Sequence, residues 1–334
     1  LGTVLQGIGV LAGVVAVSAA VFQSWTGLAN VRIWSGMVTA CVLSLLLVGG
    51  FDWLDLLNKI MMATLAVATV MAFIPVCPGV KELGRIFVPS LPGGSVVLVA
   101  AILGWMPTGI DVSVWHSFWS LEKFSRLERK GMKELASTAE RLRASLVDMR
   151  TGYILSLLTG LMFVCMGAAH LAGKAGQLQG VGFADALSRA YTAIMGGWMR
   201  HLFMLTAFFA MFSTSYTVID GFSRSFAEGL AVLFEKAAVR HAKRGIYLGF
   251  ASTTSLLAVA TIALVGNPVT LVTVVAIVSL ALAPLLYALN LWCTTRHITD
   301  CSMRPHPAVI LLGWLGVAGM ILALGLTVYV KLII

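Results

Sequence analysis

Long apolar runs alternate with short polar segments along the whole chain. A helix needs about 20 apolar residues to cross the hydrocarbon core of a bilayer. Nine segments of the chain approach or exceed that length, counting one that is interrupted in its middle: 1–22, 34–50, 54–76, 95–122, 152–173, 201–232, 246–266, 268–293 and 308–332. The pattern therefore predicts an all-α polytopic membrane protein, with residues 1–334 forming a single transmembrane domain.

The segment 95–122 contains its own interruption. Pro107 lacks a backbone N–H and clashes with the preceding turn, and Gly109 is conformationally permissive, so the helix is expected to break there. Irregular backbone at membrane depth must face protein or a water-filled cavity. Asp111 follows within one turn, where a carboxylate is costly unless it is paired or used. Secondary transporters build substrate sites from such broken helices, whereas the plainer alternative is a proline kink that only helps packing.

Composition fixes the class and excludes several functions. Of 334 residues 59% are hydrophobic and 11% charged, far from the roughly 25% charged of soluble domains. The net charge of +9 does not indicate nucleic acid, because basic residues concentrate in the loops 123–151 and 233–245. The positive-inside rule makes both loops cytoplasmic, which puts Leu1 inside and Ile334 outside. The spacing of the five cysteines matches neither a disulfide framework nor a zinc site. The sequence has no GxxxxGK[ST] motif, which argues against ATP-driven transport.

Three polar features outside the broken segment also carry predictions. Residues 124–151 are predicted to form an amphipathic helix on the cytoplasmic face, and 174–200 an extracellular loop with a short interfacial helix. Asp220, Arg224 and Glu228 are spaced four residues apart and could pair along one helix. We expect that charged stripe to mark the cytoplasmic end of the span 201–232, with a gate as the second interpretation.

The order of these motifs resembles the Nramp family of divalent-metal transporters, or a divergent branch of it. Met106-Pro107-Thr108 stands where that family's sixth helix breaks at Met-Pro-His. The polar run 213–217 with Asp220-Gly221-Phe222 resembles the family's eighth helix, and 284–290 its proline-containing tenth helix. The resemblance implies an inverted-repeat transporter fold, like that of amino-acid/sodium symporters, with this chain covering helices three to eleven.

Three departures from the family pattern matter. The family's first two helices, with their metal-binding Asp-Pro-Gly-Asn motif, have no counterpart here, and we expect that the numbering omits them. Thr108 replaces the histidine of the family's Met-Pro-His motif. His116 lies further along the chain than the second histidine of the family's sixth helix. The family's proton route uses its third and ninth helices, but the segments 1–22 and 246–266 contain no Asp, Glu, His, Lys or Arg. We therefore expect no proton coupling.

The resemblance and the ligand chemistry together give a candidate set for the transported ion. Thioether sulfur favours manganese or iron(II), while carbonyl and carboxylate oxygens also suit magnesium. The candidates are the Met106 sulfur, the Leu103 and Gly104 carbonyls, Thr108, Asp111 and Asn290. Their alternative roles are ordinary packing for Met106, a structural hydrogen bond for Asp111, and interhelical bonding for Asn290.

The expected function is secondary transport of a divalent metal cation, not enzymatic catalysis. The metal ion is expected to be the substrate, and no cofactor is expected. The expected partner is the lipid bilayer, and the expected location is the bacterial inner (plasma) membrane. Neither the ion nor the oligomeric state follows from the sequence. A transporter of the same fold for a small organic substrate such as an amino acid stays open, because freed amides capture carboxylates as freed carbonyls capture cations. A third alternative is a non-transporting membrane subunit.

Overall fold

The computed structural model describes residues 2–48, 51–79, 96–105, 109, 111–129, 137–171, 182–234, 237–298 and 303–333. Within these ranges the chain is helical and contains no strand, which confirms the predicted all-α class. It divides into two compact units: unit 1 comprises Leu1–Ser90 and Leu157–Val272, and unit 2 comprises Leu91–Ser156 and Thr273–Ile334.

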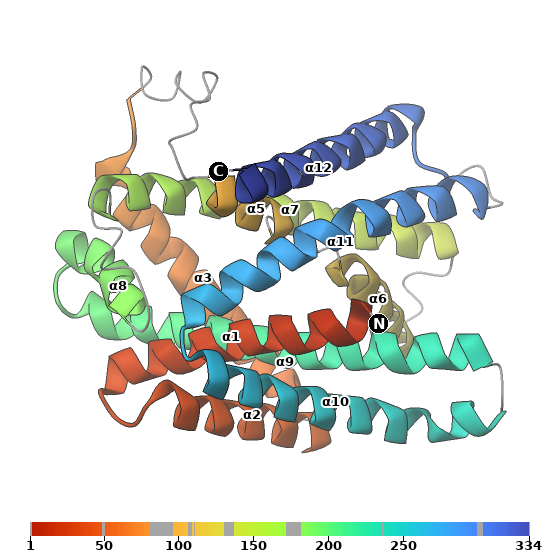
Figure 1. The fold of residues 1–334 in the computed structure, drawn as a ribbon, viewed down its shortest axis with the longest axis horizontal. Coiled ribbons are helices and arrows are strands. Elements are labelled where there is room, and N and C mark those ends of the chain that lie inside the picture. The colour runs from red at the N-terminus through yellow and green to blue at the C-terminus, as the bar shows by residue number, and fades with distance from the viewer. Residues whose placement is uncertain are drawn as a thin grey trace. The chain divides into compact units, whose positions relative to one another are not determined.

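Unit 1 is built around its first helix. Helix α1 (Gly2–Thr26) packs against α2 (Val31–Val48), α9 (Met199–Phe234) and α10 (Ala237–Val265), and Figure 1 shows these helices running side by side. Small buried residues of α1, among them Ala16 and Ala19, allow this close packing because interfaces within a membrane rely on van der Waals contact. The helix ends at Gly27, whose φ of 69° is one that glycine adopts without strain.

A second group of helices in unit 1 lies near the start of α9. It consists of α3 (Phe51–Phe73), the short 3₁₀ turn η1 (Ile74–Val76) and α8 (Gly182–Met195). The hydroxyls of Thr69 and Tyr191 lie 2.9 Å apart in the buried interface. A short helix within 174–200 agrees with the sequence prediction.

Ion pairs hold the start of α9 to α8. Asp185 accepts hydrogen bonds from Arg189 and, at 3.1 Å, from Arg200, which also donates to the Ser24 carbonyl of α1. The bond from Arg189, followed by the charges of both arginines, lowers the pKa of Asp185 below its usual value. The stabilisation is therefore present above the ordinary carboxyl pKa and is lost only as pH falls through the lowered one.

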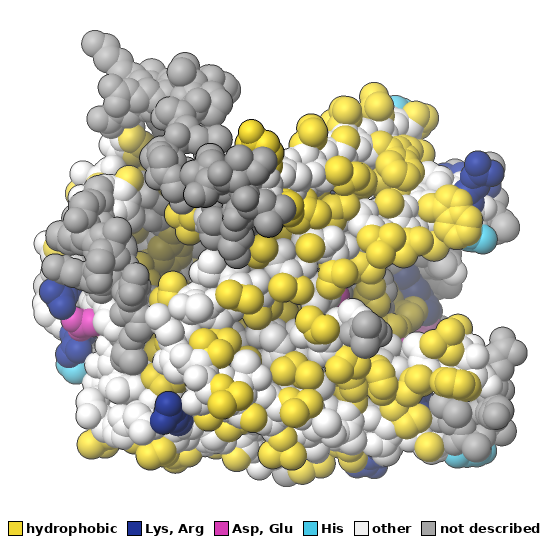
Figure 2. All heavy atoms as spheres, viewed as in Figure 1, with side chains coloured by type: hydrophobic (Ala, Val, Ile, Leu, Met, Phe, Trp, Pro, Cys, Tyr) yellow, Lys and Arg dark blue, Asp and Glu magenta, His cyan; other side chains and the backbone are white. Residues whose placement is uncertain are grey.

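Unit 2 contains the interrupted segment. Its helices are α5 (Val96–Trp105), α6 (Asp111–Arg129), the first part of α7 (Thr138–Leu171), most of α11 (Pro268–Arg296) and α12 (Pro307–Ile333). Helix α5 packs against α12, and α12 places Gly313 against Leu291 of α11. Figure 2 shows many hydrophobic side chains on the visible surface of α11 and α12. Leu285 and Trp292 of α11 and Leu322 of α12 are exposed. Such surfaces are expected to face lipid.

Seven of the described helices are long and apolar enough to cross a membrane. This is the pattern of an integral multi-pass membrane protein. The apolar part of α2, Val31–Leu47, is shorter, and α5 has 10 residues because its segment is interrupted.

The predicted surface helix over 124–151 is wrong as a single element. Residues 124–129 end α6, and α7 begins at Thr138 and continues without a break to Leu171. The start of α7 has a physical cause: Ser137 Oγ accepts from the Glu140 amide, and Glu140 accepts from the Ser137 amide at 3.0 Å. This reciprocal cap is the S-x-x-E signature of a helix start, and it lies 15 residues before the predicted span.

Candidate functional site

The predicted interruption of the segment 95–122 is confirmed. Helix α5 ends at Trp105, α6 begins at Asp111, and Gly109 lies outside both helices. The Gly109 carbonyl accepts from the Val112 amide at 3.1 Å, which leads the chain into α6. Met106, Pro107 and Thr108 lie outside the described residues, so their predicted roles are not tested.

The end of α5 offers backbone oxygens. A helical carbonyl at Leu103 would accept from residue 107, and Pro107 has no N–H to donate. Gly104 is the next residue, and both belong to the last described turn of α5. The carbonyl ends of the peptide dipoles give a helix C-terminus a partial negative charge, which favours a cation. The ligand roles of Leu103 and Gly104 stay a prediction.

Helix α11 lies against both halves of the interrupted segment. Trp105 Nε1, at the end of α5, donates to Ser279 Oγ at 3.1 Å. Asn290 Nδ2, eleven residues further along α11, donates to Ser113 Oγ of α6 at 3.4 Å. The two contacts place α11 beside the last residue of α5 and beside the first turn of α6.

Gly104 permits a close approach between α5 and α11. A Cβ atom at this position would overlap the carbonyl oxygen of Ala276 and lie 3.1 Å from the Leu280 nitrogen. Both are backbone atoms of α11, which cannot turn aside as a flexible side chain can. The absence of a side chain at Gly104 therefore sets the distance between the two helices next to the interruption.

Asp111 and Asn290 occupy different environments. Asp111 is partly buried at the first position of α6. That position suits a negative charge because helix N-termini carry partial positive charge. Asn290 is exposed, and its hydrogen bond to Ser113 is the interhelical role named as its alternative. Within the described ranges, no group of three or more His, Cys, Asp or Glu residues could hold a metal ion.

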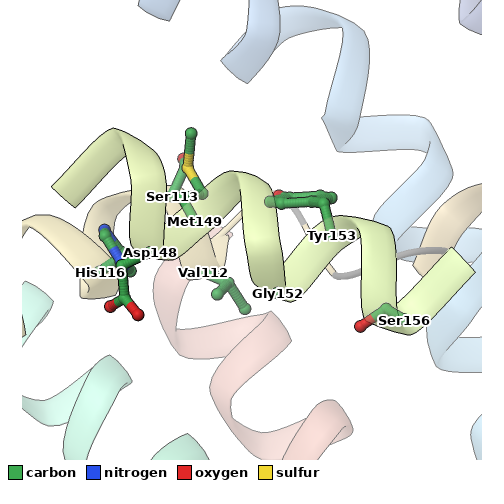
Figure 3. A pocket seen from close by; sticks show the side chains of 8 residues that line it. All are labelled: Val112, Ser113, His116, Asp148, Met149, Gly152, Tyr153 and Ser156. Atoms are coloured by element: carbon green, nitrogen blue, oxygen red, sulfur yellow. The ribbon is translucent and has the colours of Figure 1, made fainter. Parts of the chain in front are cut away.

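A cavity of about 320 Å³, with a mostly apolar lining, lies between α6 and α7. Figure 3 shows the His116 ring and the Asp148 carboxylate toward one end of the cavity and Tyr153 and Ser156 toward the other. Ser113 also lines the cavity, so the residue that binds Asn290 is accessible from it. The full lining consists of Val112, Ser113, His116, Asp148, Met149, Gly152, Tyr153 and Ser156.

The sequence reasoning missed Ser279 and Asp148. A signal for Ser279 was present, because residues 279 and 290 are eleven apart, close to three helical turns, and so share one face of α11. Asp148, Gly152 and Ser156 similarly share one face of α7 at spacings of four. Asp148 was hidden because it was assigned to a surface helix and not to α7.

The charged stripe of α9 is only partly as predicted. Asp220 is 5% exposed and binds Arg224 Nε at 2.8 Å, which confirms the pairing at i and i+4. Tyr247 of α10 donates to the same carboxylate at 2.8 Å. Glu228 pairs with Lys243 of α10 and not within the stripe. The stripe therefore joins α9 to α10.

Comparison with known proteins agrees with the resemblance seen in the motifs. Residues 1–330 match the family described as natural resistance-associated macrophage protein-like, or Nramp. The chain is also 30% identical, over 220 residues, to an uncharacterized protein of Pasteurella multocida (strain Pm70). That alignment covers 64% of this chain and 48% of the relative, so the chain spans about half the length of the curated relative it matches.

Proposed function

The chain belongs to the Nramp family, and on that premise we propose that it forms the pathway by which a divalent metal cation crosses a membrane. The proposal follows chiefly from one observation within unit 2, namely the interruption between α5 and α6, with α11 bonded to a residue on either side of it. Such an interruption supplies the backbone oxygens that a cation needs at membrane depth. The family match favours this function over transport of an organic substrate.

The proposed ligands combine backbone and side-chain groups. The Leu103 and Gly104 carbonyls, at the negative end of α5, provide hard oxygens for manganese, iron(II) or magnesium. Asp111 provides a carboxylate at the start of α6, and Asn290 an amide oxygen from α11. From the sequence we add the Met106 sulfur and the Thr108 hydroxyl.

We further propose that uptake is driven by the membrane potential and not by protons. A proton relay needs titratable groups along its path, and neither α1 nor the segment 246–266 of α10 contains Asp, Glu, His, Lys or Arg. A membrane potential supplies about 2.3 kcal/mol per charge per 100 mV, which doubles for a divalent ion. We propose the inner membrane of a bacterium as the location.

Replacing Met106 by Ala should change selectivity more than total transport. Loss of the soft ligand should lower manganese uptake relative to magnesium roughly tenfold, equivalent to about 1.4 kcal/mol. The measurement is uptake of both ions by the full-length protein in proteoliposomes, with protein-free vesicles as blanks. Met62→Ala, at an exposed position of α3, is the matched control and should leave the ratio unchanged.

Three outcomes of this assay are informative. A ratio that is equal in Met106→Ala and in the parent shows that the sulfur is not a ligand. Uptake of amino acids without uptake of either metal contradicts the proposed function as a whole. Metal uptake that Met106→Ala and Met62→Ala reduce equally points to a general effect on folding.

A further inference from the structure

Helix α11 contains a proline in its interior, at position 284. Proline has no backbone N–H, so the carbonyl four residues earlier, that of Leu280, loses its normal helical donor. Both Pro284 and Leu280 are buried. No lipid group can replace the missing hydrogen bond, because a bilayer core offers no donors. A carbonyl oxygen in the middle of α11 therefore has capacity for another ligand.

The position of this carbonyl is fixed by contacts on both sides. The Ala276 carbonyl faces Gly104 of α5, and the Leu280 carbonyl lies one turn further on the same side of α11, because residues four apart share a helix face. Trp105 contacts α11 at Ser279, and Ser113 contacts it at Asn290. The Leu280 carbonyl thus lies beside the end of α5, between the two contacts.

The neutral oxygen atoms around this carbonyl suit a cation better than an anion. Neither α5 nor the stretch of α11 before Arg296 contains a Lys, Arg, His, Asp or Glu residue. The groups offered there are the carbonyls at the end of α5, the Leu280 carbonyl and the Ser279 hydroxyl oxygen. An anionic substrate would need N–H donors, and main-chain carbonyls offer none. Neutral hard oxygens are ligands for magnesium and manganese.

We propose that the main-chain carbonyl of Leu280, released by Pro284, is a ligand of the transported divalent cation. This inference rests on the proposed function and extends it by giving α11 a backbone contribution in addition to Asn290. Pro284 then acts through Leu280 and does not itself touch the ion.

The test is Pro284→Ala, which restores the N–H and lets the Leu280 carbonyl form its helical hydrogen bond. We expect binding of Mn²⁺ and Mg²⁺ to the purified full-length protein, measured by isothermal titration calorimetry, to weaken about tenfold or more. Pro268→Ala is the matched control, because Pro268 is the first residue of α11, where no helical N–H is missing. Its affinity should equal that of the parent.

A second variant separates binding from folding. Pro284→Val is close to proline in size and also restores the N–H, so it should weaken binding as Pro284→Ala does. Size-exclusion chromatography and thermal melting show whether each variant folds. If a folded variant binds both ions as tightly as Pro268→Ala does, the inference is wrong. The same holds if transport falls while affinity stays unchanged, since Pro284 would then act only on helix shape. If the parent itself binds neither ion, the proposed function fails.

Discussion

Gly104→Ala should destabilise the protein and abolish cation uptake, although it adds only one carbon atom. Alanine is intrinsically better than glycine in a helix by about 1 kcal/mol. Here the added Cβ would overlap the Ala276 carbonyl oxygen and press on the Leu280 nitrogen. Overpacking of a rigid interface costs about 1–3 kcal/mol, and both neighbours are backbone atoms, so we expect the upper end of that range. The readouts are the thermal melting temperature in detergent and metal uptake in proteoliposomes.

Gly316→Ala on α12 is the control for this prediction. A Cβ there meets nothing within 4 Å, so the substitution should be neutral or slightly stabilising. Equal melting temperatures for Gly104→Ala and Gly316→Ala would show that α5 and α11 are not in close contact next to the interruption.

Asp220→Ala should be the most damaging single change in unit 1. The carboxylate is buried and accepts from both Arg224 and Tyr247, so its removal breaks the ion pair with the guanidinium and the hydrogen bond from the tyrosine hydroxyl. Breaking a buried pair costs about 3–5 kcal/mol, and we expect the low end because the Arg224 side chain is 36% exposed. Tyr247→Phe removes one hydrogen bond to a charged group and should cost about 2 kcal/mol.

Unfolding in mixed detergent micelles would measure both changes. The control is Glu228→Gln, which weakens the more exposed pair with Lys243 and should cost less than about 1 kcal/mol. A loss for Asp220→Ala no larger than that for Glu228→Gln would contradict a structural role for the buried cluster.

The sequence predicted those features that depend on local chemistry. Pro107 and Gly109 predicted the division into α5 and α6, because proline and glycine act through the backbone wherever the helix lies. The long apolar runs predicted the membrane class, since no soluble domain could bury them. The start of α7 was missed, although the Ser137 and Glu140 cap is also local.

Contacts between distant segments could not be predicted in the same way. Ser279 binds Trp105 across 174 residues, and Tyr247 reaches Asp220 from the next helix. Which helix faces which depends on packing along entire helices, and a single sequence carries no direct record of it. The role of Gly104 was likewise hidden, because the sequence gives its carbonyl as a ligand but not the backbone of α11 that lies against it.

The most direct test of the account records metal and proton movement in the same proteoliposomes, loaded with a metal-sensitive dye and a pH dye. With an inside-negative potential and no pH gradient, we expect Mn²⁺ or Mg²⁺ to accumulate without inward acidification. Abolishing the potential should slow uptake, and protein-free vesicles should show neither signal. Acidification that follows metal influx and disappears without protein would contradict uncoupled transport, and the absence of any metal influx would contradict the proposed function.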